Sequence, residues 1–169
     1  MIAYALNNRL TPFISMQNQH NAIYREEERE MMPMLKHYGV GTVPWGPIAA
    51  GREFSLVTIA DKSVLCRPYK DMDSTTRGAG RVKDGRGEFP SDKKIIDTVE
   101  QIASKKGVSM AEVALAWSLG SQWVTAPIVG IRSTERLDEL LKGLELKLSE
   151  EERGAIDEHY QPLKIRGHT

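Results

Sequence analysis

A tryptophan beside a Gly-Pro turn is the feature of this 169-residue sequence best suited to contact a ligand. Residues 40–51 read VGTVPWGPIAAG, so an apolar run ends at Pro44 and Trp45 follows it. A short apolar run that ends in Gly and Pro is typical of a buried parallel strand. In α/β proteins, ligands bind beyond the carboxyl ends of such strands. Trp45 is therefore a candidate ligand contact; the alternative is a tryptophan that only packs.

A second candidate site lies at the start of a predicted helix, residues 134–144. Ser133 comes directly before it, and the free N–H groups of a helix N-terminus bind phosphate. Arg132 and Arg136 are four residues apart, so they share a face if both are helical, and arginine suits bidentate phosphate contacts. The alternative is an ordinary solvated face on which Arg136 pairs with Glu139.

Composition excludes several classes of function. Lys+Arg and Asp+Glu both number 23, so no basic excess indicates a nucleic-acid partner. The single cysteine, Cys66, allows neither an intramolecular disulfide nor a Cys-rich metal site, and no His, Asp and Glu residues have metal-ligand spacing. No run of 18 apolar residues predicts a membrane span, and Met1 to Leu10 has no signal-peptide pattern. We therefore expect a cytoplasmic α/β protein without a metal.

The first half of the sequence predicts a strand–helix–strand unit. Met1 to Leu10 resembles the end of a helix, and residues 13–17 (FISMQ) form a short buried strand. Residues 25–38 have helical spacing, with a kink or restart at Pro33 and a stop at Gly39. The strand 40–44 completes a unit that requires parallel strands. The apolar stripe expected on this helix comprises Met31, Met32, Leu35 and Tyr38.

Helices dominate the second half, after a long irregular loop over residues 52–90 in which 54–60 could form a strand. A serine stands at the start of each of the four helices predicted here, and two of these serines have a glutamate three residues on, as in a capping box. The first expected helix runs from an N-cap at Ser91 to Lys106, and the second, 110–119, is capped by Ser109 and Glu112 and directs Val113, Ala114 and Trp117 inward. A strand over 124–129 follows. The helix 134–144 has an inward stripe of Leu137, Leu140, Leu141 and Leu144, and the last helix runs from Ser149 to about His159.

Three stretches in this order, SMQNQHN, PWGPIAAG and APIVGIRSTERLDELL, resemble the carboxyl-terminal half of an aldo-keto reductase. REEEREMMPMLKHYGVG and KKGVSMAEVALAWSL are similar to the fungal aryl-alcohol-dehydrogenase-like branch. The resemblance covers nearly all of residues 11–162 except 52–64. It implies a (β/α)8 TIM barrel, with this chain as a single partial domain, residues 1–169, truncated at its N-terminus. It also implies NADP(H) bound across the carboxyl ends of the strands.

The resemblance assigns cofactor contacts residue by residue. Gln17 corresponds to the glutamine that hydrogen-bonds the nicotinamide carboxamide, and Trp45 to the aromatic residue on which the nicotinamide stacks. Leu140 departs from the family, where an asparagine commonly contacts the adenine. The pyrophosphate loop would comprise Gly46, Pro47, Ile48 and Ala50, and the adenosine end would comprise Gly130, Arg132, Ser133, Arg136 and Glu139.

Two further departures concern chemistry and length. The family's catalytic Asp, Tyr, Lys and His motifs are absent, so we assign no catalytic residue and expect the chain to begin after them. Residues 52–64, REFSLVTIADKSV, interrupt the resemblance, and we hypothesise that they are translated non-coding sequence. The nearby Tyr24, Tyr38, His20 and His37 match no catalytic motif.

Two functions remain open. The first is an NADP(H)-dependent oxidoreductase that interconverts small carbonyl compounds and alcohols. The second is a catalytically inactive half-barrel that binds a nucleotide or a protein partner. A half-barrel exposes two sheet edges, which promotes pairing between chains, so we expect self-association.

Overall fold

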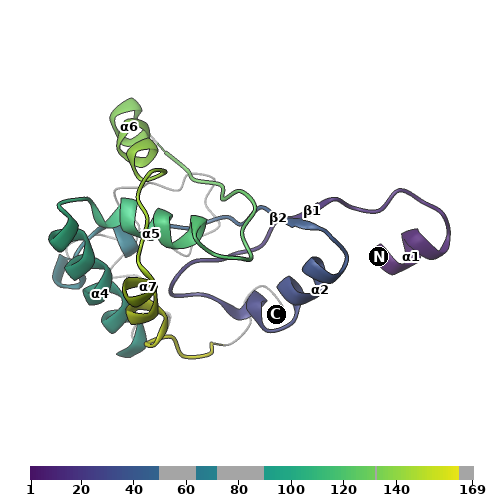
Figure 1. The fold of residues 1–169 in the computed structure, drawn as a ribbon, viewed down its shortest axis with the longest axis horizontal. Coiled ribbons are helices and arrows are strands. Elements are labelled where there is room, and N and C mark those ends of the chain that lie inside the picture. Colours follow the sequence, from purple (N-terminus) through teal and green to yellow (C-terminus); the bar gives the residue numbers. More distant parts are fainter. Residues whose placement is uncertain (50–63, 72–89, 132, 164–169) are drawn as a thin grey trace.

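The computed structural model describes residues 1–49, 64–71, 90–131 and 133–163, and Figure 1 shows their arrangement. The elements are α1 (Ile2–Asn7), β1 (Ser15–Met16), the 3-10 turn η1 (Glu26–Glu28), α2 (Met31–His37), β2 (Gly41–Thr42), the 3-10 turns η3 (Val64–Cys66) and η4 (Tyr69–Asp71), α4 (Pro90–Lys106), α5 (Met110–Leu119), α6 (Thr134–Lys142) and α7 (Glu150–Asp157). In this part of the chain, no helix is long and apolar enough to cross a membrane.

The strands β1 and β2 are parallel, as the strand–helix–strand pattern predicts. Ser15 lies opposite Gly41 and Met16 opposite Thr42. The pairing continues past both strands, because the Trp45 N–H donates to the Asn18 carbonyl at 2.8 Å. A parallel α/β arrangement is therefore confirmed.

A third extended segment, residues 125–128, lies along the other edge of β2. Its first two backbone N–H groups both donate to the Thr42 carbonyl, at 2.9 and 3.3 Å, and the Ile128 N–H donates to the Pro44 carbonyl at 2.8 Å. Pro127 has no N–H, and the doubled bond at Thr42 disturbs the spacing of the ladder. The strand expected over 124–129 is therefore an extended segment with one parallel bridge.

The hydrophobic core lies where α4, α5 and α7 meet, which Figure 1 shows opposite the end of the chain that carries α1. Helix α5 is buried from Met110 to Ser118, and its predicted capping box between Ser109 and Glu112 is present. Trp117 is fully buried, as predicted. On α4 the buried apolar side chains are Ile95, Ile96, Val99, Ile102 and Ala103.

Three predicted helix boundaries are wrong. Residues 25–38 form the turn η1 followed by α2, and Pro33 occupies the first turn of α2, where no backbone N–H is needed. Gly39 ends this helix with φ +67°, as predicted. Ser91 is not an N-cap, because α4 already includes Pro90, a residue suited to the first helical position. The last helix ends at Asp157, two residues before the predicted His159.

Several apolar side chains predicted to be buried are exposed. Phe13 and Ile14 are 58% and 82% exposed, because β1 pairs only with β2 among the described elements. On α6 only Leu140 is buried, since the helix packs against α5 through that side chain. The exposed members of the predicted stripes are Tyr38, Leu137, Leu141 and Leu144.

The predicted strand 54–60 and most of the predicted loop 52–90 lie outside the described residues. Inside that loop the structure places η3 and η4. Val64, the last residue of the predicted insertion, is 4% exposed and belongs to the core. Its N–H donates to the Ala49 carbonyl at 3.1 Å, so the two residues that flank 50–63 lie side by side.

Candidate functional site

The backbone of Trp45 is held from both sides. Its N–H donates to the Asn18 carbonyl at 2.8 Å, and its own carbonyl accepts from the His20 N–H at 3.4 Å. On the opposite edge, Trp45 forms a parallel bridge with Ile128. The indole itself is 39% exposed, as the sequence predicts for a ligand contact. A fixed backbone thus presents a large aromatic surface to solvent.

The turn after Trp45 is folded tightly. Gly46 has φ +70° and Ala49 has φ +51°, both in the left-handed region that favours glycine. The Gly46 carbonyl accepts two hydrogen bonds of 2.9 Å, from the Asn21 side-chain amide and from the Ala49 N–H. Pro47 and Ile48 are buried, so contact of these two residues with a ligand would involve backbone atoms. We call Trp45 and this turn the strand-end platform.

Gln17 belongs to the same edge of the sheet. It directly follows β1 and is exposed, and the next residue along the chain is bonded to Trp45. Gly130 follows the third extended segment and is half-buried. The ends of the three parallel segments therefore meet, as predicted. Ala50 lies outside the described residues.

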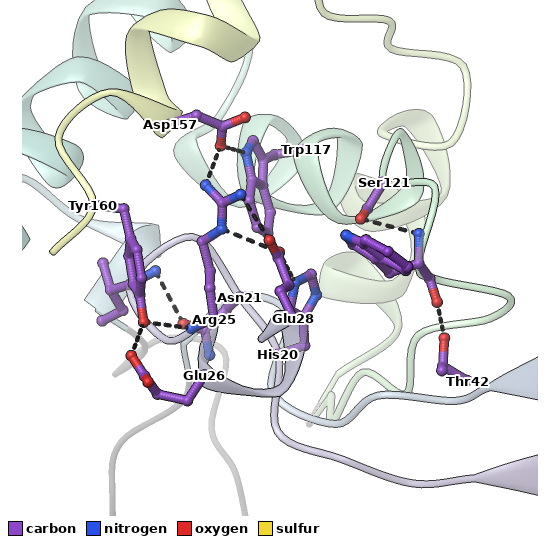
Figure 2. A network of polar contacts seen from close by, with 12 residues as sticks. His20, Asn21, Arg25, Glu26, Glu28, Thr42, Trp117, Ser121, Asp157 and Tyr160 are labelled. Atoms are coloured by element: carbon purple, nitrogen blue, oxygen red, sulfur yellow. Dashed lines mark hydrogen bonds and ion pairs between the residues drawn. The ribbon is translucent and has the colours of Figure 1, made fainter. Parts of the chain in front are cut away.

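A polar network (Figure 2) adjoins the platform through His20, whose backbone N–H donates to the Trp45 carbonyl. His20 Nε2 lies 2.7 Å from Glu28 Oε1, and Arg25 binds both oxygens of Glu28 at 3.1 and 2.9 Å. Arg25 also donates to Asp157 at 2.8 Å, and the same carboxylate oxygen accepts from the Trp117 indole N–H at 2.8 Å. The His20 ring stacks on Trp117 with 5.3 Å between centroids. The network ties the loop after β1 to α5 and α7.

The charged side chains of this network bind one another. Burial raises the pKa of the Glu28 carboxyl, but hydrogen bonds from His20 and Arg25 and the Arg25 charge outweigh burial and hold that pKa below its usual range. Burial and a 2.6 Å bond to Glu26 raise the pKa of the Tyr160 hydroxyl far above its usual range. Tyr160 therefore stays neutral and donates to Glu26. We conclude that this network is a structural brace.

The second predicted site lies on α6, which Figure 1 places apart from β1 and β2. Ser133 is the N-cap of α6, as predicted, and its hydroxyl accepts from the Arg136 N–H at 3.4 Å. Arg136 Nη1 lies 2.5 Å from Glu139 Oε2, so the ion pair of the alternative interpretation is present. Arg132 lies outside the described residues.

The remaining candidates have structural roles. Tyr24 is 2% exposed and pairs with Asn21 in a turn, and His37 lies in the last turn of α2 with its ring edge against Tyr38. Within the described ranges, no group of three His, Cys, Asp or Glu side chains can hold a metal ion.

Sequence reasoning missed the brace and the role of Asn21. The polar run 18–21 directly after a strand was a usable signal, because polar residues at strand ends often face a site. Its partners were not predictable, since Arg25 meets Asp157 across 132 residues and Asn21 meets Gly46 across 25 residues.

The chain is similar to known proteins along most of its length. Residues 1–161 match the sequence model of the Aldo/keto reductase family. The chain is 42% identical over 165 residues to versiconal hemiacetal acetate reductase of Aspergillus parasiticus, an alignment that covers 95% of this chain and 44% of that protein. It is 43% identical over 156 residues to a putative aryl-alcohol dehydrogenase of Schizosaccharomyces pombe, covering 92% and 40% respectively. The chain spans about two fifths of the length of these relatives.

Proposed function

The chain belongs to the aldo/keto reductase family, and from this membership we propose that it binds NADP(H) on the strand-end platform. The reaction served is the interconversion of aldehydes or ketones with alcohols, on small-molecule substrates. Membership in the family and the similarity to fungal reductases and aryl-alcohol dehydrogenases support an oxidoreductase. The single observation that carries the cofactor proposal is the exposed Trp45 indole on a backbone bonded at both edges.

The residues present fit a nicotinamide nucleotide. A flat heteroaromatic ring gains contact area by stacking on Trp45, and the exposed amide of Gln17 offers a donor and an acceptor to a carboxamide. Gly46 has no side chain, and a Cβ built there would meet only the Asn21 amide at 4.0 Å, so the backbone is open to close approach. At the other end, the N-terminus of α6 and Arg136 suit a phosphate, and the 2′-phosphate is what distinguishes NADP(H) from NAD(H).

Binding and orientation are the steps assigned to this chain. NADPH, when bound, supplies a hydride to the carbonyl carbon. A reduction also requires a proton donor, and the tyrosines described nearest the platform do not supply one. Tyr24 is buried in a turn, and the Tyr160 hydroxyl donates to Glu26. We therefore assign the role of proton donor to neither of these two tyrosines.

Calorimetric titration of the 169-residue chain with NADPH and with NADH tests this proposal. We expect saturable one-site binding of NADPH. NADH should bind more weakly, because it lacks the 2′-phosphate with which Arg136 would interact. 2′,5′-ADP, which carries the adenosine end alone, is expected to bind as well. A folded chain that binds none of the three would overturn the proposal.

A specific observation favours a second function, self-association. Residues 1–14, which we call the arm, carry a single charged side chain, Arg9, and extend beyond the sheet in Figure 1. Their exposed large side chains present on the order of 700 Å² of apolar surface, close to the roughly 800 Å² per partner of a standard interface. We propose a second copy of this chain as the partner. The exposed apolar side chains of the arm are Met1, Tyr4, Leu6, Leu10, Phe13 and Ile14.

Sedimentation velocity over a hundredfold range of concentration measures this association. We expect dimers that dissociate on dilution and a monomer when Phe13 and Ile14 are both replaced by serine. In the matched control, serine replaces Leu137 and Leu141 on α6, which are also exposed but lie outside the arm. This control should still form dimers. A wild-type chain that remains a monodisperse monomer and unfolds cooperatively would contradict self-association.

A further inference from the structure

Asn21 links the loop that follows β1 to the turn that follows β2. The side chain is 1% exposed, and its amide donates to the Gly46 carbonyl at 2.9 Å. The amide oxygen accepts from the Ile23 N–H at 3.2 Å. The backbone of Asn21 is closed by a pair of bonds with Tyr24, at 3.1 and 3.0 Å. A single side chain thus uses both its donor and its acceptor to join two loops.

The contact reaches a peptide of the platform that lies beyond the hydrogen bonds described for the sheet. The backbone of Trp45 is bonded by neighbouring strands, whereas the sheet ladder ends before Gly46. Glycine at φ +70° has easy access to other conformations, so the orientation of its peptide depends on what holds the carbonyl. Here the Asn21 amide and the Ala49 N–H hold it.

Asn21 is itself anchored to the body of the protein. The preceding residue, His20, is fully buried against Trp117 and bonded to Glu28, and Arg25 connects Glu28 to Asp157 on α7 (Figure 2). The helical core therefore fixes the loop, the loop fixes Asn21, and Asn21 fixes Gly46. The last residue in this series is adjacent to Trp45.

We propose that Asn21 is a positioning residue that sets the Gly46 peptide and thereby the direction of the Trp45 ring toward the nicotinamide end of the cofactor. This inference rests on the proposed function. At neutral pH the amide satisfies both contacts and an ionised carboxylate does not, because the position requires one donor for a carbonyl and one acceptor for an N–H. Aspartate is nearly the same size but, when ionised, places a carboxylate oxygen against the Gly46 carbonyl oxygen.

The test compares two ligands on Asn21→Asp by calorimetry. NADPH carries the nicotinamide, whereas 2′,5′-ADP reports on the adenosine end alone. We expect about tenfold weaker binding of NADPH, from the loss of one hydrogen bond and the displaced ring, and unchanged binding of 2′,5′-ADP. The matched control is Asn8→Asp, since Asn8 is an exposed amide bonded to a backbone carbonyl inside the arm. It should change neither affinity.

A pH series adds a readout that a purely structural role does not predict. The buried aspartate of Asn21→Asp has a raised pKa and, once protonated, can donate to the Gly46 carbonyl again. As the pH is lowered from 8 to about 5.5, the affinity of the Asn21→Asp protein for NADP⁺ should therefore approach the affinity of wild type measured at the same pH. If Asn21→Asp does not fold, Asn21→Ala is tested in its place with the same two ligands.

The outcomes separate the two proposals. Equal losses for both ligands, or no loss for either, would overturn positioning by Asn21 while leaving cofactor binding in place. A folded wild-type chain that binds neither ligand would refute the proposed function, and the role of Asn21 with it.

Discussion

The two ends of the candidate cofactor site are built in different ways. The strand-end platform is held by contacts that span the chain, from the Asn21 amide to the half-buried ion pairs of Arg25 with Glu28 and Asp157. On α6, by contrast, the Ser133 cap and the Arg136–Glu139 pair each join residues three apart on one helix. Long-range contacts fix a position in the fold, whereas local contacts fix only the helix itself. The proposed nicotinamide end is therefore the more preorganised, whereas the proposed adenosine end depends more on charge.

The largest expected effect concerns the charge-dependent end. Arg136→Ala should weaken NADPH binding about tenfold to a hundredfold, since a charge-assisted hydrogen bond contributes about 1.5–3 kcal/mol. NADH binding should change much less, because it lacks the 2′-phosphate. Calorimetry with both dinucleotides measures the difference. The same variant should reduce the salt dependence of NADPH binding.

A further variant serves as a control for Arg136. Arg29→Ala breaks an ion pair of the same spacing, with Glu26, outside the site and should leave NADPH binding unchanged. Equal weakening of NADPH and NADH by Arg136→Ala would contradict a contact with the 2′-phosphate.

The second prediction concerns the preorganised end and its dependence on pH. The pKa of Glu28 is lower in the folded protein, so its contribution to stability is fully present above about pH 4.5. That contribution is lost as the pH falls through the depressed folded pKa. Glu28→Gln should cost about 2 kcal/mol at pH 7 and flatten the acid limb of the stability curve. Urea unfolding between pH 3 and pH 7 measures both effects.

The neighbouring Glu30 provides the control, since it is exposed. Glu30→Gln should retain the acid limb and the wild-type stability. A Glu28→Gln protein that loses stability toward acid as steeply as wild type would show that other carboxyls govern this limb.

The smallest expected effect comes from removing residues 52–63. After that deletion, Ala49, Ala50, Gly51 and Val64 would be consecutive, and the observed bond from the Val64 N–H to the Ala49 carbonyl would become the ordinary bond of a β-turn with glycine third. We expect a change of less than about 1 kcal/mol in the free energy of unfolding and unchanged NADPH affinity. Urea unfolding and calorimetry test this. A chain that no longer folds would show that the segment is required.

Short sequence patterns predicted the parts of the fold that depend on interactions between residues close in the sequence. The capping box at Ser109, the stop at Gly39 and the exposed Trp45 beyond a parallel strand are all present. The predicted helix 134–144 exists, but its leucine stripe is mostly exposed, because periodicity shows which face is apolar and not what covers it. The brace around Arg25 was not predictable, since its partners come from distant parts of the chain.

The central claim is that Trp45 contacts the nicotinamide ring, and one titration tests it most directly. NADPH is added to Trp45→Ala and to the control Trp123→Ala while tryptophan fluorescence and calorimetric affinity are recorded. Trp123 is the control because its ring is half-buried beneath Lys36. We predict that Trp45→Ala loses the saturable quenching and binds NADPH about tenfold more weakly, whereas Trp123→Ala retains both. Wild-type quenching and affinity in Trp45→Ala would contradict the account.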